Sequence, residues 1–170
     1  MPLNNVQKSA NFDAFLKLDN VKGESQDDKH KDEIELLSWS WNVQNQGAGH
    51  YGSGSGAGKV AVGDMHIIKR IDKASPTLFK SVCTGDHIGN GTLTVRKAGG
   101  QNAIEYLKIE LSDIFVSSLE TSTHEDHPLI LEEVSLNFTK FKISYTPQTK
   151  SGGSGATGDF GWDIGKNKTV

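Results

Sequence analysis

The segment Asp13–Trp41, DAFLKLDNVKGESQDDKHKDEIELLSWSW, joins two strand-like stretches through a long charged loop. The first strand is predicted at Ala14–Leu18, because apolar residues there precede the turn-forming pair Asp19-Asn20. A second strand is predicted to begin near Ile34. The residues between them carry charges of both signs and almost no apolar side chain. Long loops of this kind in a compact domain are usually functional or disordered.

The second predicted strand alternates between apolar and polar residues through most of its length, from Ile34 to Gln44. One predicted face carries Leu37, Trp39, Trp41 and Val43, and the other carries Ser38, Ser40, Asn42 and Gln44. Large aromatic side chains on one strand face most often belong to a core. The pattern therefore predicts a strand with one buried face and one polar face.

Four further strands are predicted outside the opening segment, at residues 60–71, 92–97, 103–118 and 134–145. In the last two, the apolar phase slips by one residue, near Ser112-Asp113 and near Thr139-Lys140. Such a slip indicates a bulge or a bend in the strand. Long strands that bend in the middle are typical of small closed barrels.

One helix is predicted, and the sequence marks both of its ends. Ser75 is expected to cap it, Pro76 to occupy its first turn and Gly85 to end it. Its predicted apolar stripe consists of Leu78, Phe79, Val82 and Cys83. A helix this short is stable only when it docks on another element. The predicted fold is therefore mainly β, a small closed β-barrel of two packed antiparallel sheets with one short α-helix docked on it.

Composition limits the classes of function. A chain of 170 residues is most simply a single domain, residues 1–170, and buries roughly 70% of the surface of its unfolded chain. We expect flexible tails at 1–12 and 165–170 and an extended loop at 19–32. The net charge of -3, with mixed signs throughout, favours neither nucleic acid nor an anionic membrane as partner. No long apolar stretch predicts a membrane span or a cleaved signal peptide, so cytoplasmic synthesis is expected.

The glycine runs do not predict a nucleotide site. Gly58-Lys59 lacks both the first glycine and the Ser or Thr of a P-loop. The G-x-G-x-x-G matches that begin at Gly47 and at Gly153 do not precede a predicted helix, so no helix N-terminus is available for a phosphate. Both runs have the composition of flexible loops.

Catalytic and metal chemistry is also not indicated. The cluster from His124 to His127 lies between two strands and before Pro128, where a charged turn is favoured over a metal site. The single cysteine, Cys83, is expected to pack as a small apolar residue in the helix stripe. Glu132 and Glu133 are adjacent and would point to opposite faces of a strand. We predict no enzyme activity, no cofactor and no metal.

Eight segments, in order from Phe15 to Ile164, cover nearly the whole chain: LKLDNVKGES, KHKDEIELLSWSW, GAGKV, KRIDKASPTLFKSVCTGDHI, TVRKAGG, EYLKIELSDIFVSSL, LNFTKFKISYTPQ and GWDI. Through these segments the chain resembles the Hcp (hemolysin-coregulated protein) family, the tube proteins of bacterial type VI secretion. The resemblance implies a barrel that assembles into a six-membered ring, rings that stack into the inner tube, and secretion with small effectors carried in the lumen. The alternative is a phage-tail-tube-like ring or a binding module without a type VI role.

The resemblance also implies roles for particular residues. Ser38, Ser40 and Asn42 would line the channel, and Ser40 matches a family position that contacts cargo. The loop would reach the next ring through Gly23, Glu24, Asp27, Asp28, Lys29, Lys31 and Asp32. The implied partners are further copies of this chain in a homohexamer and in stacked rings, the spike and sheath proteins and small secreted effectors. The implied location is the bacterial cytoplasm before firing and the medium or a target cell afterwards.

Overall fold

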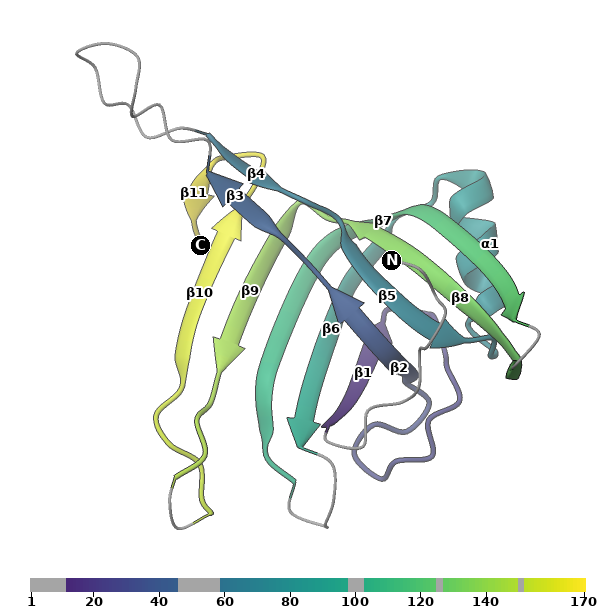
Figure 1. The fold of residues 1–170 in the computed structure, drawn as a ribbon. Coiled ribbons are helices and arrows are strands. Elements are labelled where there is room, and N and C mark those ends of the chain that lie inside the picture. Colours follow the sequence, from purple (N-terminus) through teal and green to yellow (C-terminus); the bar gives the residue numbers. More distant parts are fainter. Residues whose placement is uncertain (1–11, 46–58, 98–102, 125–126, 150–151) are drawn as a thin grey trace.

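The computed structural model describes residues 12–45, 59–97, 103–124, 127–149 and 152–170, apart from the side chains of His124 and His127, and these segments form eleven strands and one helix (Figure 1). In chain order the elements are β1 Phe12–Leu18, β2 Ile34–Ser40, β3 Val43–Asn45, β4 Val60–Val62, β5 Met65–Arg70, α1 Ser75–Thr84, β6 Ile88–Lys97, β7 Glu105–His124, β8 His127–Asn137, β9 Lys140–Tyr145, β10 Gly158–Asp163 and β11 Lys168–Thr169. The mainly β prediction with one short helix is confirmed.

Six strands close a barrel in the order β7-β6-β1-β2-β5-β8, because β8 also pairs with β7. Closure depends on the length of β7, which has 20 residues. Its first part pairs with β6 and β9, and its second part pairs with β8. The change of partner lies at Asp113, whose φ is 53°, so the predicted bend near Ser112-Asp113 is confirmed. Strands β9, β10 and β11 extend the sheet beyond the barrel.

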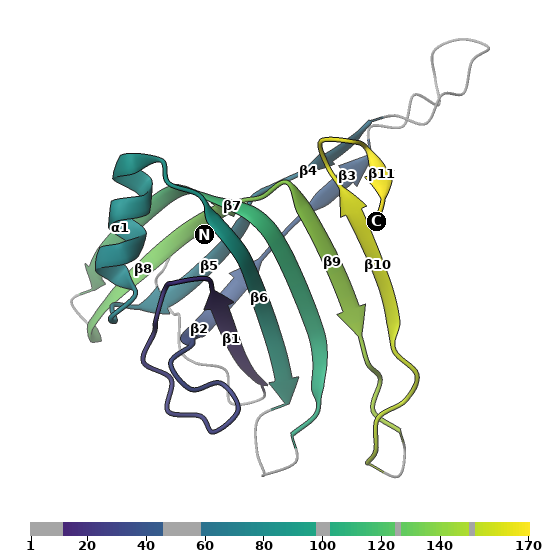
Figure 2. The same ribbon diagram turned by 180° about the vertical axis from the view of Figure 1, so that it is seen from behind.

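The core lies inside the barrel and is built from the inward side chains of alternating positions. Completely buried members include Leu16, Ile34, Ile67, Leu93 and Ile114. Burying each such side chain stabilises the fold by roughly 1.5–3 kcal/mol before conformational entropy is counted. Helix α1 docks beside β7 and adds Leu78 to the same core (Figure 2). Within the described segments, no helix combines the length and apolar character that a membrane crossing requires.

Three predicted strands are each divided in two. The strand predicted from Ile34 to Gln44 is β2 and β3, and the strand predicted at 60–71 is β4 and β5. Both break at the same place, because the Gly63 amide donates to the Asn42 carbonyl at 3.0 Å and the Trp41 indole donates to the Gly63 carbonyl at 3.0 Å. The slip predicted near Thr139-Lys140 is a turn between β8 and β9.

The face assigned to Leu37 was wrong. The pairing of β2 with β5 shifts register between Leu36 and Ser38. This bulge places Leu37 on the outer face, where it packs with Ile68 and Leu131, while Leu36 faces the core. Trp39 and Trp41 pack against the main core, as predicted. A bulge inserts one residue, so the residues on its two sides alternate in opposite phase.

The start of α1 also differs from the prediction. Ala74 occupies the N-cap position without a side-chain hydrogen bond, and its amide donates to the Asp72 carboxylate at 2.9 Å. Ser75 is the first helical residue, and its hydroxyl contacts the buried Lys69 and Glu132 instead of capping the helix. The end at Gly85 is confirmed, with a φ of 71° and its amide bonded to the Ser81 carbonyl.

The apolar stripe of α1 is narrower than predicted. Leu78 is fully buried and Val82 is partly buried, but Phe79 is 43% exposed and Cys83 is exposed. The buried residues of the helix are Ser75, Leu78 and Ser81, so the side of the helix that carries Phe79 and Cys83 faces outward. Cys83 is therefore a surface thiol and not a core residue.

The C-terminal residues 165–170 form a turn and the short strand β11. The Asp163 carboxylate accepts a hydrogen bond from the Lys166 amide at 2.8 Å, and Asn167 has a φ of 51°. This turn returns the chain to pair β11 with β10. The glycine-rich run that includes Gly153 was predicted to be a loop, but its last part, from Gly158, belongs to β10, which pairs with β9 from Gly158 to Asp163. The expected N-terminal tail and the run from Gly47 to Gly58 lie outside the described residues, except for Phe12, which begins β1.

Candidate functional site

The charged loop between β1 and β2 folds back on itself. Its two arms pair through the Gly23 amide to the Asp32 carbonyl at 2.8 Å, the Ser25 amide to the Glu33 carbonyl at 3.0 Å and the Asp32 amide to the Ser25 carbonyl at 2.9 Å. Gly23 is buried, and a Cβ there would overlap the carbonyl oxygen of Glu33. Figure 2 shows the loop beside β1 and β2. The glycine thus permits the close approach of the arms, which presents residues 26–31 as a tip.

An aromatic side chain on the outer face of β1 anchors this loop. Phe15 points away from the barrel core, between Ala14 and Leu16 that face it, yet it is only 2% exposed. The His30 ring stacks on the Phe15 ring with centroids 4.3 Å apart and an interplanar angle of 7°. The Arg96 guanidinium lies over the Phe15 ring at 5.0 Å from the centroid. The loop therefore covers an apolar spot on its own barrel.

Two sets of charged contacts tie the loop tip to the barrel. Arg96 of β6 donates to both carboxylate oxygens of Asp27, and it also lies 3.4 Å from Asp13 of β1. The His30 ring nitrogens lie 2.8 Å from Glu33 and 3.1 Å from Glu105 of β7. Three barrel strands thereby contribute to the position of the loop.

The pKa shifts of Asp27, Arg96 and Glu105 agree with these charged contacts. The hydrogen bond from Arg96 lowers the pKa of Asp27 below its ordinary value, against the opposing effect of burial. The same pairing raises the pKa of Arg96. For Glu105, burial disfavours the charged form, but the hydrogen bond and charge of Lys108, together with His30, outweigh it and lower the pKa. Both shifts favour the ionised forms of Asp27 and Glu105.

We predict that Asp27→Asn lowers the free energy of unfolding at pH 7 by about 1–2 kcal/mol, between the values for exposed and buried charged pairs. Since the pKa of Asp27 is lowered on folding, its stabilisation is complete above about pH 5 and is lost as the pH falls through the lowered pKa. Urea unfolding at pH 7 and pH 3 should therefore show a smaller difference between wild type and variant at pH 3. Asp28→Asn, at an exposed position of the same loop, is the control. If Asp27→Asn changed the free energy of unfolding by the same amount at pH 7 and at pH 3, the prediction would be wrong.

The seven loop residues predicted as a contact surface divide into two groups. Glu24, Asp28, Lys29, Lys31 and Asp32 are exposed. Asp27 is half-buried against Arg96, and Gly23 is buried. The sequence did not reveal His30, Arg96 and Glu105 as loop anchors, because the latter two are distant in the chain. The one available signal was Phe15 beside Leu16, since apolar residues on both faces of a strand indicate that both faces are covered.

Ser38 and Ser40 lie together on the outer face of the barrel. Ser38 pairs with Ile68 and Ser40 pairs with His66, whereas Trp39 between them faces the core. A shallow depression is lined there by Ser38, Trp39, Ser40, His66, Ile68 and Glu133. The His66 ring lies 2.8 Å from the Ser135 hydroxyl and 4.0 Å from the Glu133 carboxylate. Asn42 is exposed on the link to β3, just beyond this polar face.

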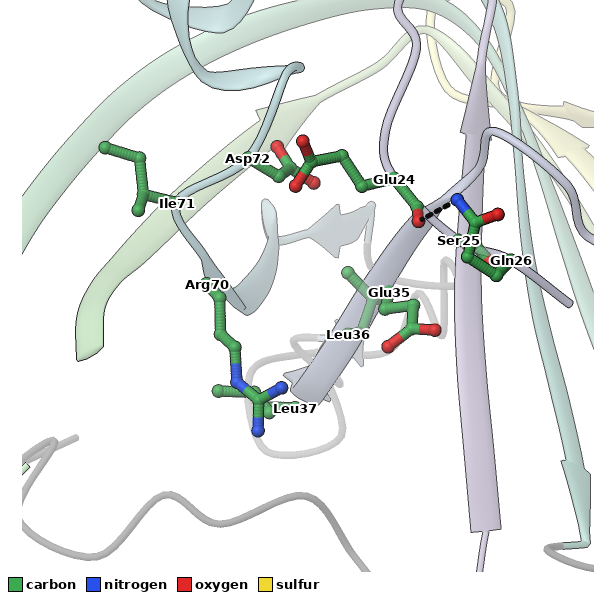
Figure 3. A pocket seen from close by; sticks show the side chains of 9 residues that line it. All are labelled: Glu24, Ser25, Gln26, Glu35, Leu36, Leu37, Arg70, Ile71 and Asp72. Atoms are coloured by element: carbon green, nitrogen blue, oxygen red, sulfur yellow. Dashed lines mark hydrogen bonds between the residues drawn. The ribbon is translucent and has the colours of Figure 1, made fainter. Parts of the chain in front are cut away.

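A second depression connects the loop to this outer face. Figure 3 shows that it is formed by three stretches of chain, which are Glu24, Ser25 and Gln26 of the loop, Glu35, Leu36 and Leu37 of β2, and Arg70, Ile71 and Asp72 at the end of β5. The side-chain amide of Gln26 donates to the backbone carbonyl of Glu24 at 3.2 Å, within the part of the loop that lines this depression. Leu37 is the chain neighbour of Ser38, so this depression lies next to the one that Ser38 and Ser40 line.

The described residues contain no group of three or more His, Cys, Asp or Glu side chains that could hold a metal ion. His124 and His127 pair at the ends of β7 and β8, while residues 125–126 of the predicted turn and the side chains of the cluster lie outside the described part. Glu132 is buried and Glu133 is partly exposed, on opposite faces as predicted.

Comparison with known proteins places this fold in one family. The family model for Hcp, described as a type VI secretion system effector, matches residues 15–145. The protein Hcp1 of Pseudomonas aeruginosa is 47% identical over 156 residues, which cover 91% of this chain and 96% of the relative.

Solved structures of proteins from type VI secretion systems are also similar to this chain. The crystal structure of Hcp1 from Salmonella typhimurium is 38% identical with a TM-score of 0.77, over 94% of this chain and 99% of that chain. A structure described as a type six secretion system protein is 28% identical with a TM-score of 0.87, over the same shares of both chains. The chain belongs to the Hcp family of secreted type VI secretion proteins.

Proposed function

We propose that this protein is the structural subunit of a type VI inner tube, in which six copies form a ring, rings stack, and the tube carries effectors and is secreted. The observation that carries the proposal is the loop tip, which presents exposed charges of both signs on a rigid base. Mixed charges suit a reversible contact between identical rings, because each exposed ion pair contributes only about 0–1 kcal/mol. The role is structural, and no reaction is assigned to the protein.

Ring closure needs a head-to-tail contact between copies of the chain. The extension of the sheet by β9 and β10 provides an apolar surface for it, because Tyr145 is 53% exposed and Phe160 is 48% exposed. Phe160 continues an aromatic row with Phe141 and Trp162, at centroid distances of 6.2 Å and 6.1 Å. Aromatic side chains that extend a core into solvent are typical of subunit interfaces. We therefore assign this surface to the contact within a ring.

The lumen is assigned to the outer face of β2 and β5. Ser38 and Ser40 there present hydroxyl groups beside His66 and Glu133, so an effector would meet hydrogen-bonding groups instead of an apolar wall. Asn42, which is exposed on the link between β2 and β3, is assigned to the same lining. Small effectors are the proposed lumen partners, and spike and sheath proteins are the proposed partners of the assembled tube.

The stacking role is tested by exchanging two charges at the loop tip. The double variant Asp28→Lys and Lys29→Glu keeps the net charge and changes only the pattern. With six loops at each junction, a loss of about 0.5 kcal/mol per loop weakens ring stacking by about 3 kcal/mol, or about a hundredfold. We expect intact rings but few tubes in sedimentation and electron microscopy, and wild-type tubes that become rarer as salt rises.

The matched control exchanges Lys80 and Asp86, which are exposed at α1 and just after it. Lys80→Glu with Asp86→Lys should stack as the wild type does. If the loop variant forms tubes as readily as this control does, the loop does not hold rings together.

A further inference from the structure

We propose that a depression on the outer face of β6, β7 and β9 receives the loop tip of a second copy of this chain, in the next ring of the stack. The inference rests on the proposed stacking role of the loop and adds the surface that the tip contacts. The depression is lined by Asn90 and Thr92 of β6, Glu110 of β7, Lys140 and Lys142 of β9, and Val170.

The loop tip and the depression lie toward opposite ends of the same strand. Arg96, near the end of β6, bonds Asp27 of the loop, whereas Asn90, near its start, lines the depression. Both side chains lie on the outer face, since Leu93 and Val95 between them belong to the core. The stretch from Asn90 to Arg96 spans about 20 Å in a strand. In Figure 2, β6 runs from the end near α1 to the end beside the loop. The tip is therefore too far along the barrel to occupy the depression of its own chain.

The surfaces proposed for the ring give the direction of stacking. The contact within a ring is assigned to β9 and β10, which lie beside the barrel, and the lumen is assigned to the outer face of β2 and β5. The ring axis is perpendicular to both of these directions and therefore follows the strands. A second ring shifted along this axis in the same orientation brings the start of its β6 toward the loop tip of the first. Such a head-to-tail contact joins different surfaces of identical chains.

The charges in the depression match those at the tip. Glu110 and Lys142 are exposed and directly opposite each other in the pairing of β7 with β9, and the Lys142 ammonium lies 2.8 Å from Asp159 at the surface. At the tip, Asp28 and Lys29 are exposed neighbours of opposite sign. Asp28 can therefore meet Lys142 while Lys29 meets Glu110. Each exposed pair is weak, but the contact is repeated around the ring.

The shape of the depression suits side chains of this size. Its volume is about 320 Å³, which is roughly ten times the share of one water molecule in the liquid. Leu111 and Phe141 are buried beneath it, and Val170, which is 62% exposed, adds an apolar surface at its side. The aliphatic stem of a lysine packs on such a surface while its ammonium reaches a carboxylate.

Exchanging the charges of the depression tests the contact. Glu110→Lys with Lys142→Glu keeps the net charge and leaves opposite charges facing each other across β7 and β9. If its effect per contact equals that of the loop exchange, ring stacking weakens about a hundredfold. We expect intact rings and few tubes in sedimentation and electron microscopy at low salt. Tubes as abundant as those of the wild type would overturn the proposal.

The combined variant is the sharper test. When the depression exchange is joined to Asp28→Lys and Lys29→Glu, opposite charges face each other again between rings. Stacking should then recover to within about tenfold of the wild type, because the two pairs of substitutions are coupled. A combined variant that stacks no better than either exchange alone would show that the tip does not meet this depression.

Disulfide trapping adds a measurement that does not depend on charge. Lys29→Cys and Glu110→Cys are placed together in a Cys83→Ser chain. A disulfide needs Cα atoms within about 7 Å, which the tip and the depression of one chain do not provide. Oxidised tubes should give a ladder of linked chains on a non-reducing gel, whereas rings oxidised in high salt should not. Oxidised tubes without the ladder would overturn the proposal.

The two proposals fail in different ways. If the loop exchange forms tubes as readily as the exchange of Lys80 and Asp86 does, the stacking role of the loop is wrong, and this inference falls with it. If the loop exchange loses tubes while the depression exchange keeps them, the loop still holds rings together, and only the assignment of the depression is overturned.

Discussion

Lys69→Ala is expected to lower the free energy of unfolding by about 3–5 kcal/mol, because it leaves a carboxylate buried without its charge partner. Lys69 and Glu132 are both fully buried, and their charged atoms are 2.7 Å apart. The Lys69 ammonium also lies 2.8 Å from Asp72 and 3.1 Å from the Ser75 hydroxyl. These contacts join β5 and β8 to the start of α1. Urea unfolding should show a lower midpoint with an unchanged slope.

A double variant distinguishes loss of the pair from loss of packing. Lys69→Met with Glu132→Leu replaces the pair by apolar side chains of similar length, and such exchanges are often neutral or stabilising. We therefore expect the double variant to recover most of the stability that Lys69→Ala loses. Lys80→Ala on the exposed side of α1 should change stability by no more than about 0.5 kcal/mol. A loss below about 1 kcal/mol for Lys69→Ala, or a double variant as unstable as the single one, would contradict this account.

The buried pair of Lys69 and Glu132 could be predicted only in part from the sequence. Met65, Ile67 and Lys69 occupy alternate positions, so the pattern places a lysine on the core face of β5. A lysine at a core position predicts a buried partner of opposite charge, which the sequence interpretation above does not include. The prediction that Glu132 and Glu133 face opposite ways was correct. The sequence could not say that Glu132 meets Lys69, because their strands become neighbours only when the barrel closes.

Periodicity predicted the barrel core and the bend of β7, because both depend on local alternation of side chains. It failed where a backbone irregularity intervenes. The bulge between Leu36 and Ser38 reverses the facing of Leu37, and no residue type marks it. It also failed at the loop, whose anchors Arg96 and Glu105 lie on strands far along the chain. The charges of the loop tip could therefore be predicted from local sequence, whereas the contacts of Asp27 and His30 with the barrel could not.

Phe15→Ala is expected to lower the free energy of unfolding by about 3–5 kcal/mol and to remove the protection of the loop amides. The substitution takes away the ring on which His30 stacks and over which Arg96 lies. The loop then has polar contacts but no apolar surface to cover. Calorimetry or urea unfolding measures the first effect, and hydrogen exchange of His30, Asp32 and Glu33 measures the second.

Leu16→Ala is the matched control, since the two residues are adjacent on β1 and face opposite sides of it. Both are fully packed, so the two variants should lose similar stability, about 2–5 kcal/mol for the leucine. Only Phe15→Ala should open the loop under conditions where the barrel remains folded, because local opening is governed by local contacts. If Leu16→Ala exposed the loop amides to the same degree, the loop would be held by the barrel as a whole, and the Phe15 side chain would not be its anchor.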